Sequence, residues 1–173
     1  SREYVSTLAV YAFCSVNSVL LGSAVAIGEH RALTARHVFS CIDSVLLGVK
    51  VQDIYANEYV AVPHEIAGDV DLGLLTTEES APAFLSFSYI ETAPVHIGEV
   101  LCTITGSHFA KKCGYVTTRK SALLEIALRS IRGNSGSPVY DINGMVRGIV
   151  TMATVNPVDE FLTFAVPTTI LRQ

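Results

Sequence analysis

The chain has 173 residues, half of them apolar and 16% charged, which is enough to bury the core of about one ordered domain. Its net charge is −4, its pI is about 5.7, and it has no run of Lys and Arg. These properties argue against nucleic acid or an anionic membrane as a main partner.

The first segment is long and uncharged. No charged residue occurs between Tyr4 and Gly28, a length that would span a bilayer. Polar or small residues at positions 15, 17, 18, 22 and 23 interrupt the stretch, and no basic segment precedes it. We therefore expect two buried strands joined by a polar turn, and no membrane span within this chain.

Short β-branched and aromatic runs alternate with turn residues along the whole chain. Asn143-Gly144, between two apolar runs, is the strongest hairpin signal. Only residues 167–173, which begin with proline, are expected to form a helical turn. The pattern predicts strands over residues 5–13, 19–27, 32–34, 44–51, 58–62, 70–75, 99–105, 113–118, 123–128, 137–141, 145–151 and 161–166.

The predicted strands fall into two halves of six. Residues 77–95 separate them, and this stretch is rich in Glu, Ser and Pro. We therefore expect a single all-β domain over residues 1–173, with a first half at about 1–80, a connector at about 77–95 and a second half at about 96–173. No internal repeat is visible in the sequence.

The four cysteines are Cys14, Cys41, Cys102 and Cys113, and none lies in a CxxC pair or at a zinc-like distance from a histidine. We expect four small buried apolar side chains, although their number allows two disulfides. Sparse, unpatterned cysteine in a chain of this size favours a reducing compartment, so a cytoplasmic location is expected.

The stretch GNSGSPV at residues 133–139 combines two glycines, small polar residues and a proline. It indicates either a loop with unusual backbone angles or a serine at a sharp bend, with backbone N–H groups aimed at what the serine attacks. A catalytic serine also needs a base, and the base needs a group that orients it.

His37 and Asp71 are the candidate partners of such a serine. His37 stands in LTARHVF, directly after an apolar strand end, whereas the histidines at positions 30, 64, 96 and 108 lie in polar turns and are expected to be solvated or satisfied. Asp71 in GDVDLGLL leads into an apolar strand. A buried acid there would accept a hydrogen bond from a histidine ring.

LTARH, DVDLGLL and GNSGSPV, in that order, resemble the three signature blocks of the chymotrypsin-like (trypsin-fold) serine proteases. GSAVAI at 22–27 and GIVTMA at 148–153 resemble the strands before the histidine block and after the nucleophile block. FAVP at 164–167 resembles the last strand of the high-temperature-requirement branch. The resemblance implies two six-stranded antiparallel β-barrels, with a short C-terminal helical turn and an active site between the barrels.

The resemblance also implies roles for particular residues. Ser135 matches the nucleophile, His37 the general base and Asp71 the orienting carboxylate, with Asp69 as the runner-up. The N–H groups of Gly133 and Ser135 match the oxyanion hole. The positions that match the specificity pocket and the strand that pairs with an extended peptide are Arg129, Ser130, Val150, Thr151, Met152 and Ala153.

Two departures from the secreted members of the family are informative. Val38 follows His37 where those members have a bridged cysteine, and Asn134 precedes Ser135 where they have an aspartate that pairs with a freed amine. Activation by that ion pair is therefore not expected. Short loops, the expected lack of a disulfide framework and GNSGSP together look more like the chymotrypsin-like proteases of positive-strand RNA viruses, or a trimmed high-temperature-requirement protease, than like secreted enzymes.

The sequence therefore predicts a serine endopeptidase that works without metal or organic cofactor. It would act on an extended peptide or a polyprotein through an acyl-enzyme. The alternative is a catalytically silent relative that uses the same fold as a peptide- or protein-binding module. Arg129 pointing into the pocket would favour an acidic or amide P1 residue, whereas Arg129 facing solvent would leave a pocket for medium apolar side chains.

Overall fold

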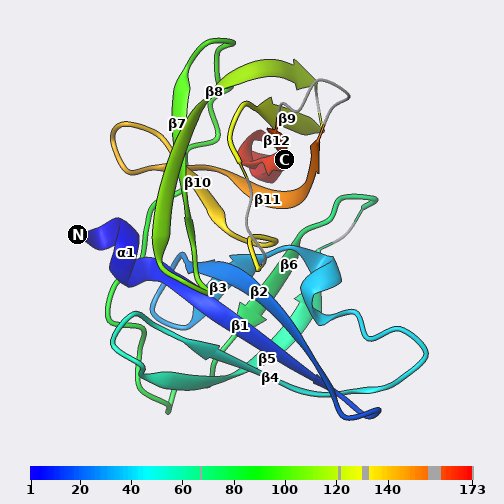
Figure 1. The fold of residues 1–173 in the computed structure, drawn as a ribbon. Helices are drawn as coiled ribbons and strands as arrows, with labels where there is room; N and C mark the ends of the chain where they lie inside the picture. The colour runs from blue at the N-terminus through cyan, green and yellow to red at the C-terminus, as the bar shows by residue number, and fades with distance from the viewer. Residues whose placement is uncertain (67, 121, 130–132, 156–160, 173) are drawn as a thin grey trace.

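Twelve strands form two closed six-stranded antiparallel barrels, one below the other in Figure 1. This computed structural model describes residues 1–66, 68–120, 122–129, 133–155 and 161–172, and for residues 153–155, 161 and 172 only the backbone is described. The predicted all-β double-barrel fold is confirmed.

The first barrel places its strands in the order β1-β2-β3-β6-β5-β4. The uncharged N-terminal stretch forms the β1–β2 hairpin, whose register runs from Thr7 opposite Val25 to Cys14 opposite Ser18. Among the described residues there is no helix of the length and apolar character that crossing a bilayer requires. The strands are β1 (Thr7–Cys14), β2 (Ser18–Ala26), β3 (Arg31–Thr34), β4 (Leu46–Gln52), β5 (Glu58–Glu65) and β6 (Gly73–Thr76).

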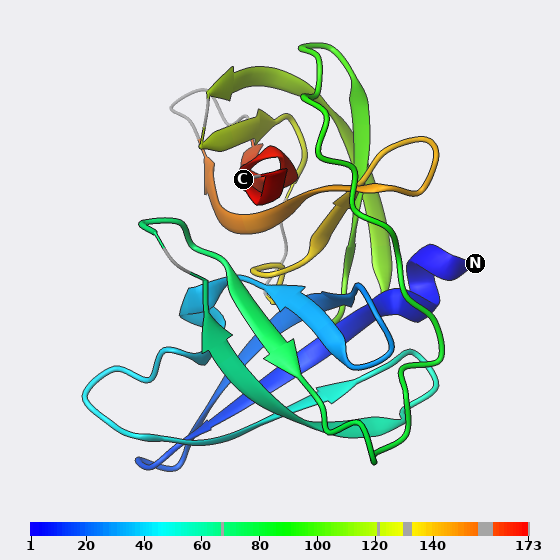
Figure 2. The same cartoon turned by 180° about the vertical axis from the view of Figure 1, so that it is seen from behind.

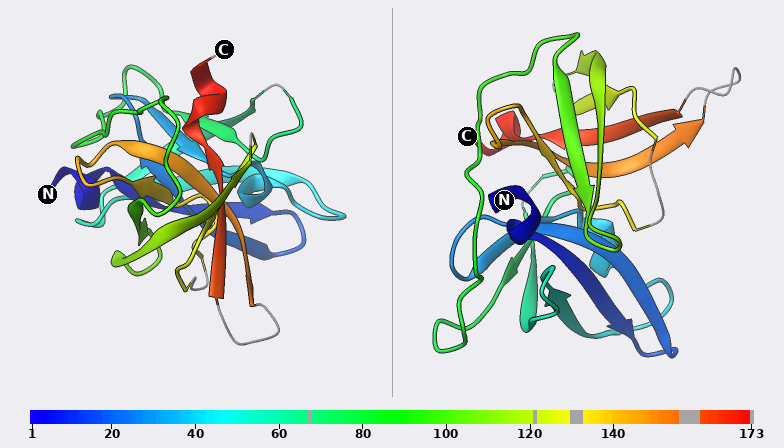
Figure 3. Two further views of the ribbon diagram at one scale, coloured as in Figure 1. Left: turned by 90° about the horizontal axis from the view of Figure 1, so that it is seen from above. Right: turned by 60° about the vertical axis from the view of Figure 1, so that its left-hand side comes forward.

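The second barrel has the order β7-β8-β9-β12-β11-β10, which repeats the order of the first barrel. The connector between the barrels, drawn in green, runs along the outside of both, as Figure 2 and the right view of Figure 3 show. The strands are β7 (Val100–Thr105), β8 (Ala110–Lys120), β9 (Leu123–Ile126), β10 (Pro138–Tyr140), β11 (Val146–Val155) and β12 (Phe161–Pro167).

Three short helical segments complete the described structure: α1 (Arg2–Ser6), η1 (Arg36–Phe39) and η2 (Thr168–Arg172). The turn η2 lies where a C-terminal helical turn is predicted, whereas α1 and η1 are too short to show a helical period in the sequence. Strand β6 begins at Gly73, so Asp71 lies in the loop before the strand and not within the predicted strand 70–75.

The larger apolar core fills the first barrel and continues into the contact with the second barrel. Leu8, Val25 and Leu75 lie inside the first barrel, and Tyr140 and Ile149 of the second barrel belong to the same buried cluster. A smaller cluster, which includes Leu101, Val116 and Ile126, fills the second barrel. Each barrel therefore has a core, and the two barrels share apolar packing where they meet.

The cysteines are paired, so the expectation of four unbridged apolar side chains was wrong. Cys14 at the end of β1 bonds to Cys41, which follows η1 by two residues, and this closes a loop with a sequence separation of 27. Cys102 and Cys113 stand directly opposite each other on β7 and β8, with their Cα atoms 4.0 Å apart. Barrel closure and strand register bring the paired cysteines together. Neither can be predicted from the spacing of cysteines in the sequence.

Removing either disulfide should destabilise the protein. The Cys14→Ala/Cys41→Ala variant should lose about 3.5 kcal/mol and the Cys102→Ala/Cys113→Ala variant about 3 kcal/mol, because the first bridge closes the longer loop in the unfolded chain. Urea unfolding of the two variants and the wild type would measure this. Unchanged unfolding midpoints in both variants would contradict the pairing.

Candidate active site

His37 projects from η1, whose other side is anchored in the first barrel. The next two side chains, Val38 and Phe39, are buried. Each of them packs where a glycine leaves room: a Cβ on Gly22 would lie 2.5 Å from Val38, and a Cβ on Gly73 would lie 2.4 Å from the Phe39 ring. This anchoring leaves the His37 side chain 48% exposed at the surface of the barrel.

Asp71 accepts three hydrogen bonds and holds His37 through two of them. The ring Nδ1 of His37 lies 2.6 Å from Oδ2 of Asp71, and the backbone N–H of His37 donates to Oδ1 at 2.9 Å. The third donor is the hydroxyl of Thr151, on β11 of the second barrel, at 2.5 Å. Asp71 therefore links the histidine to the opposite barrel.

The surroundings of Asp71 keep it ionised. Burial raises the pKa of its carboxyl, but the hydrogen bonds from the His37 ring, the Thr151 hydroxyl and the His37 N–H outweigh burial and lower the pKa to about 2. An ionised Asp71 orients the ring with Nδ1–H towards the carboxylate and leaves Nε2 as the basic nitrogen. Asp69, the runner-up, is exposed and makes no side-chain hydrogen bond with a described residue.

Ser135 lies in a tight loop between the barrels. Gly133 and Gly136 both adopt φ of +86°, which a residue with a side chain rarely takes. Asn134 is buried, and its side-chain oxygen accepts a hydrogen bond from the Thr105 hydroxyl at 2.8 Å. The position before Ser135 is thus held by a neutral hydrogen bond within the second barrel.

Gly22 brings η1 and the Ser135 loop close together. A Cβ on Gly22 would touch both the Val38 side chain and, at 3.1 Å, the carbonyl oxygen of Ser135. In the part of the chain that the structure describes, no hydrogen bond joins the Ser135 hydroxyl to the His37 ring. Such contacts are often long in a free enzyme and shorten when substrate binds.

The predicted substrate strand has a free side. Strand β11 pairs with β10 only as far as Ile149, whereas Met152 and Ala153 pair with Phe164 and Thr163 of β12 on the other side. From Thr151 onward, β11 therefore has a strand neighbour on one side only among the described residues. That arrangement suits the addition of an extended peptide as a further strand.

The other predicted pocket residues differ in exposure. Val150 is buried, the Met152 side chain is 56% exposed and Arg129 is exposed. Ser130 lies outside the described residues.

Two of the histidines that were expected to be solvated or satisfied bond to threonine hydroxyls, His30 to Thr77 and His64 to Thr76, each at 2.9 Å.

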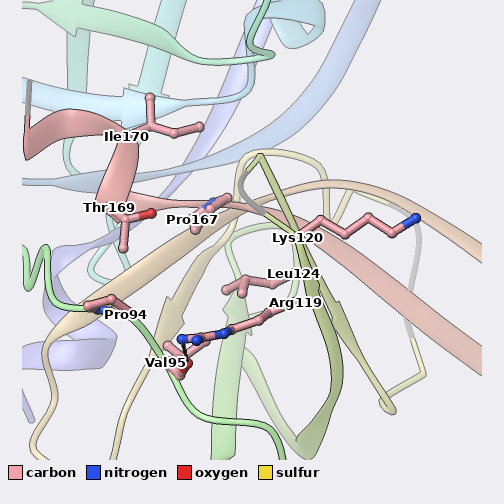
Figure 4. Close-up of a pocket in the computed structure, with 8 residues that line it drawn as sticks. All are labelled: Pro94, Val95, Arg119, Lys120, Leu124, Pro167, Thr169 and Ile170. Atoms are coloured by element: carbon pink, nitrogen blue, oxygen red, sulfur yellow. Dashed lines mark hydrogen bonds between the residues drawn. The ribbon is translucent and has the colours of Figure 1, made fainter.

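A separate cavity of about 440 Å³ lies beside the C-terminal turn η2. Figure 4 shows its lining, in which Arg119 donates a hydrogen bond to the Val95 carbonyl and Lys120 points away from Pro167 and Ile170. None of the predicted site residues lines this cavity. Among the described residues no group of three His, Cys, Asp or Glu side chains is placed to hold a metal ion.

Ser23 and Thr105 are the residues of this region that sequence reasoning missed. Ser23 lies within GSAVAI, which resembles a family strand, but the motif assigns its side chain no role. Thr105 ends a predicted strand and carries no signal of its contact with Asn134. Both side chains act through hydrogen bonds to residues far away in the sequence.

No protein-family model matches the chain, and no curated protein matches it. Solved structures do. Rv3671c from M. tuberculosis, solved as an inactive Ser-to-Ala mutant, is 19% identical over 99% of this chain and 85% of its own, with a TM-score of 0.76.

The HtrA-type protease AlgW, solved with a tripeptide, is 20% identical with a TM-score of 0.79. This chain is covered to 98% and spans 58% of AlgW, so it corresponds to only part of that protein. At these identities the likeness establishes the fold: the chain is a chymotrypsin-like double β-barrel.

Asp71→Asn should lower stability in a way that depends on pH. The pKa of the Asp71 carboxyl is about 2 in the folded protein, against an ordinary 3.8. The ionised carboxyl therefore adds about 2 kcal/mol to the free energy of unfolding above about pH 5, and this contribution is lost as the pH falls through 2. Urea unfolding of wild type and variant at both ends of this range would measure the difference. Asp69→Asn is the matched control and should differ little from wild type at either pH. An equal loss of stability from Asp71→Asn at both pH values would contradict the lowered pKa of Asp71.

Proposed function

We propose that the protein is a serine endopeptidase in which Ser135, His37 and Asp71 carry out the reaction. The observation that carries the proposal is the hydrogen bonding of Asp71 to both the ring and the backbone of His37, on a fold shared with a protease. A histidine held in this way presents Nε2 as a base, which is what a serine nucleophile requires.

The reaction would proceed in two halves. His37 takes the hydroxyl proton as Ser135 Oγ adds to the carbonyl carbon, and the N–H groups of Gly133 and Ser135 bind the oxygen that becomes negative. The C–N bond then breaks as His37 gives its proton to the leaving amine. Water then adds to the acyl carbon as His37 takes one of its protons, and the bond from this carbon to Ser135 Oγ breaks as His37 returns the proton to Oγ, which releases the acid.

The substrate in this proposal is an extended peptide that pairs with β11 along residues 151–153. The free side of β11 supports this, because main-chain hydrogen bonds would hold the substrate whatever its sequence. Polyprotein processing, as in the viral relatives that the sequence resembles, is part of the same proposal. No nucleic acid is proposed as a partner.

The second candidate is a peptide-binding module without catalysis. It is favoured by one observation: within the described residues the Ser135 hydroxyl is not bonded to the His37 ring. The retention of all three side chain types favours the enzyme. A cytoplasmic location stays a prediction, and the two disulfides argue against it because such bonds persist mainly in oxidising compartments.

Substitutions in the three residues test the proposed function. Ser135→Ala and His37→Ala should each abolish nearly all peptide hydrolysis while the circular dichroism spectrum stays unchanged. Asp71→Asn should lower kcat about 10⁴-fold, because an amide favours the wrong tautomer of the ring. Turnover on a peptide library would measure the loss of hydrolysis, and labelling by a fluorophosphonate would measure the reactivity of Ser135. Labelling that persists undiminished in His37→Ala would refute the proposed base.

The library also tests the side chain that the enzyme selects. We expect Glu, Asp or Gln at P1, because Arg129 would make charge-assisted hydrogen bonds to a carboxylate. Arg129→Ala should then reduce cleavage after Glu and Asp more than after Gln. A profile dominated by Lys or Arg would refute this expectation, and dominant Phe or Leu would mean that Arg129 does not enter the pocket.

A further inference from the structure

Ser23 on β2 joins the first barrel to the loop that carries Ser135. It is fully buried and uses every polar group it has. Its N–H donates to the Ser135 carbonyl at 2.8 Å and its hydroxyl donates to the Gly133 carbonyl at 2.7 Å. The same hydroxyl accepts from the N–H of Gly106 at 2.8 Å, and the Ser23 carbonyl accepts from the Thr34 hydroxyl at 2.7 Å.

These bonds fix consecutive peptide units of the loop. Ser23 holds the carbonyls of Gly133 and Ser135, and the N–H of Ser137 holds the carbonyl between them, that of Asn134, at 2.9 Å. In a trans peptide the N–H points opposite to the carbonyl of the same unit, so the held Asn134 carbonyl sets the direction of the Ser135 N–H. The N–H groups of Gly133 and Ser135 bond to no other described residue and are available to a ligand.

The loop lies so close to Ser23 that position 136 has no room for a side chain. A Cβ on Gly136 would lie 2.0 Å from the Ser23 carbonyl oxygen and 2.5 Å from the Thr34 hydroxyl. If the peptide unit between Gly133 and Asn134 turned over, its carbonyl would leave the Ser23 hydroxyl and lose a buried partner. The hydroxyl of Ser23 thus holds the peptide unit that lies between the unit carrying the Gly133 N–H and the unit carrying the Ser135 N–H.

We infer that Ser23 is a positioning residue for hydrolysis at Ser135. Its hydroxyl and N–H hold the 133–136 loop from the opposite barrel, so that the N–H groups of Gly133 and Ser135 face the oxyanion. The inference rests on the proposed function and adds to it a residue that acts through the loop. The effect should therefore fall on the transition state and not on the binding of substrate.

The test is Ser23→Ala, which removes the hydroxyl and keeps the N–H. We expect kcat per titrated active site to fall about ten- to a hundredfold, less than the ~10²–10³-fold cost of losing an oxyanion donor itself, with KM within about twofold. Affinity for a peptide boronate, which becomes tetrahedral when Ser135 Oγ adds to boron, should fall by a similar factor. Affinity for the cleaved product peptide should not change.

Ser6→Ala is the matched control. Ser6 is also fully buried, and its hydroxyl bonds to Ser88 and Tyr140, on the connector and the second barrel, with no contact to the 133–136 loop. This variant should lower the unfolding midpoint while kcat per active site and boronate affinity stay at wild-type values. Ser23→Gly also lacks the hydroxyl and replaces Ser23→Ala should that variant not fold.

Two results would overturn the inference. One is wild-type kcat and boronate affinity in the folded Ser23 variants, and the other is an equal fall in kcat from Ser6→Ala, which would indicate a general effect of stability. Failure of the proposed function is distinguishable, because it shows in the wild type: a protein that neither hydrolyses peptides nor labels at Ser135 has no transition state to position, and the role of Ser23 falls with it.

Discussion

Hydrogen bonds between buried and half-buried polar groups hold the two barrels in register at the candidate site. Asp71 of the first barrel accepts a hydrogen bond from the Thr151 hydroxyl of the second, and Ser23 of the first barrel donates two hydrogen bonds to carbonyls of the Ser135 loop. Apolar surfaces tolerate small sliding movements, whereas a buried donor or acceptor that loses its partner is costly. The spacing between the halves at this point is therefore set by bond lengths.

The fold could be predicted from the sequence because the features that indicate it, the strand-forming runs and the motifs, are each local in the chain. Short β-branched and aromatic runs separated by turn residues predicted the number of strands, and the resemblance of three short motifs, in order, to a known family predicted how the two halves are arranged. The site was only partly readable. His37, Asp71 and Ser135 stand in recognisable motifs, although their catalytic roles stay predictions, whereas the contact of Ser23 with Gly133 joins positions 110 residues apart and follows from the closed barrels alone.

The cysteine pairing and the short helical turns could not be predicted from the sequence either, because both depend on contacts between distant parts of the chain. Cys102 and Cys113 are opposite only because of the β7–β8 register, and Cys14 meets Cys41 only because η1 turns the chain back towards the end of β1. A turn of four residues such as η1 has no period to detect, yet it decides where the His37 ring points. Short segments whose shape depends on the surrounding barrel are thus the least predictable part of the molecule.

Each barrel closes its own ladder of strands, and a single connector along the outside joins them. A chain cut within that connector would consist of two fragments, each with a complete set of strand pairings but with apolar surface that the other fragment normally covers, such as Tyr140 and Ile149. Neither fragment would contain His37, Asp71 and Ser135 together. Mixing the fragments would thus rebuild the candidate site by complementation, which offers a way to make the proposed peptidase activity depend on bringing two other proteins together.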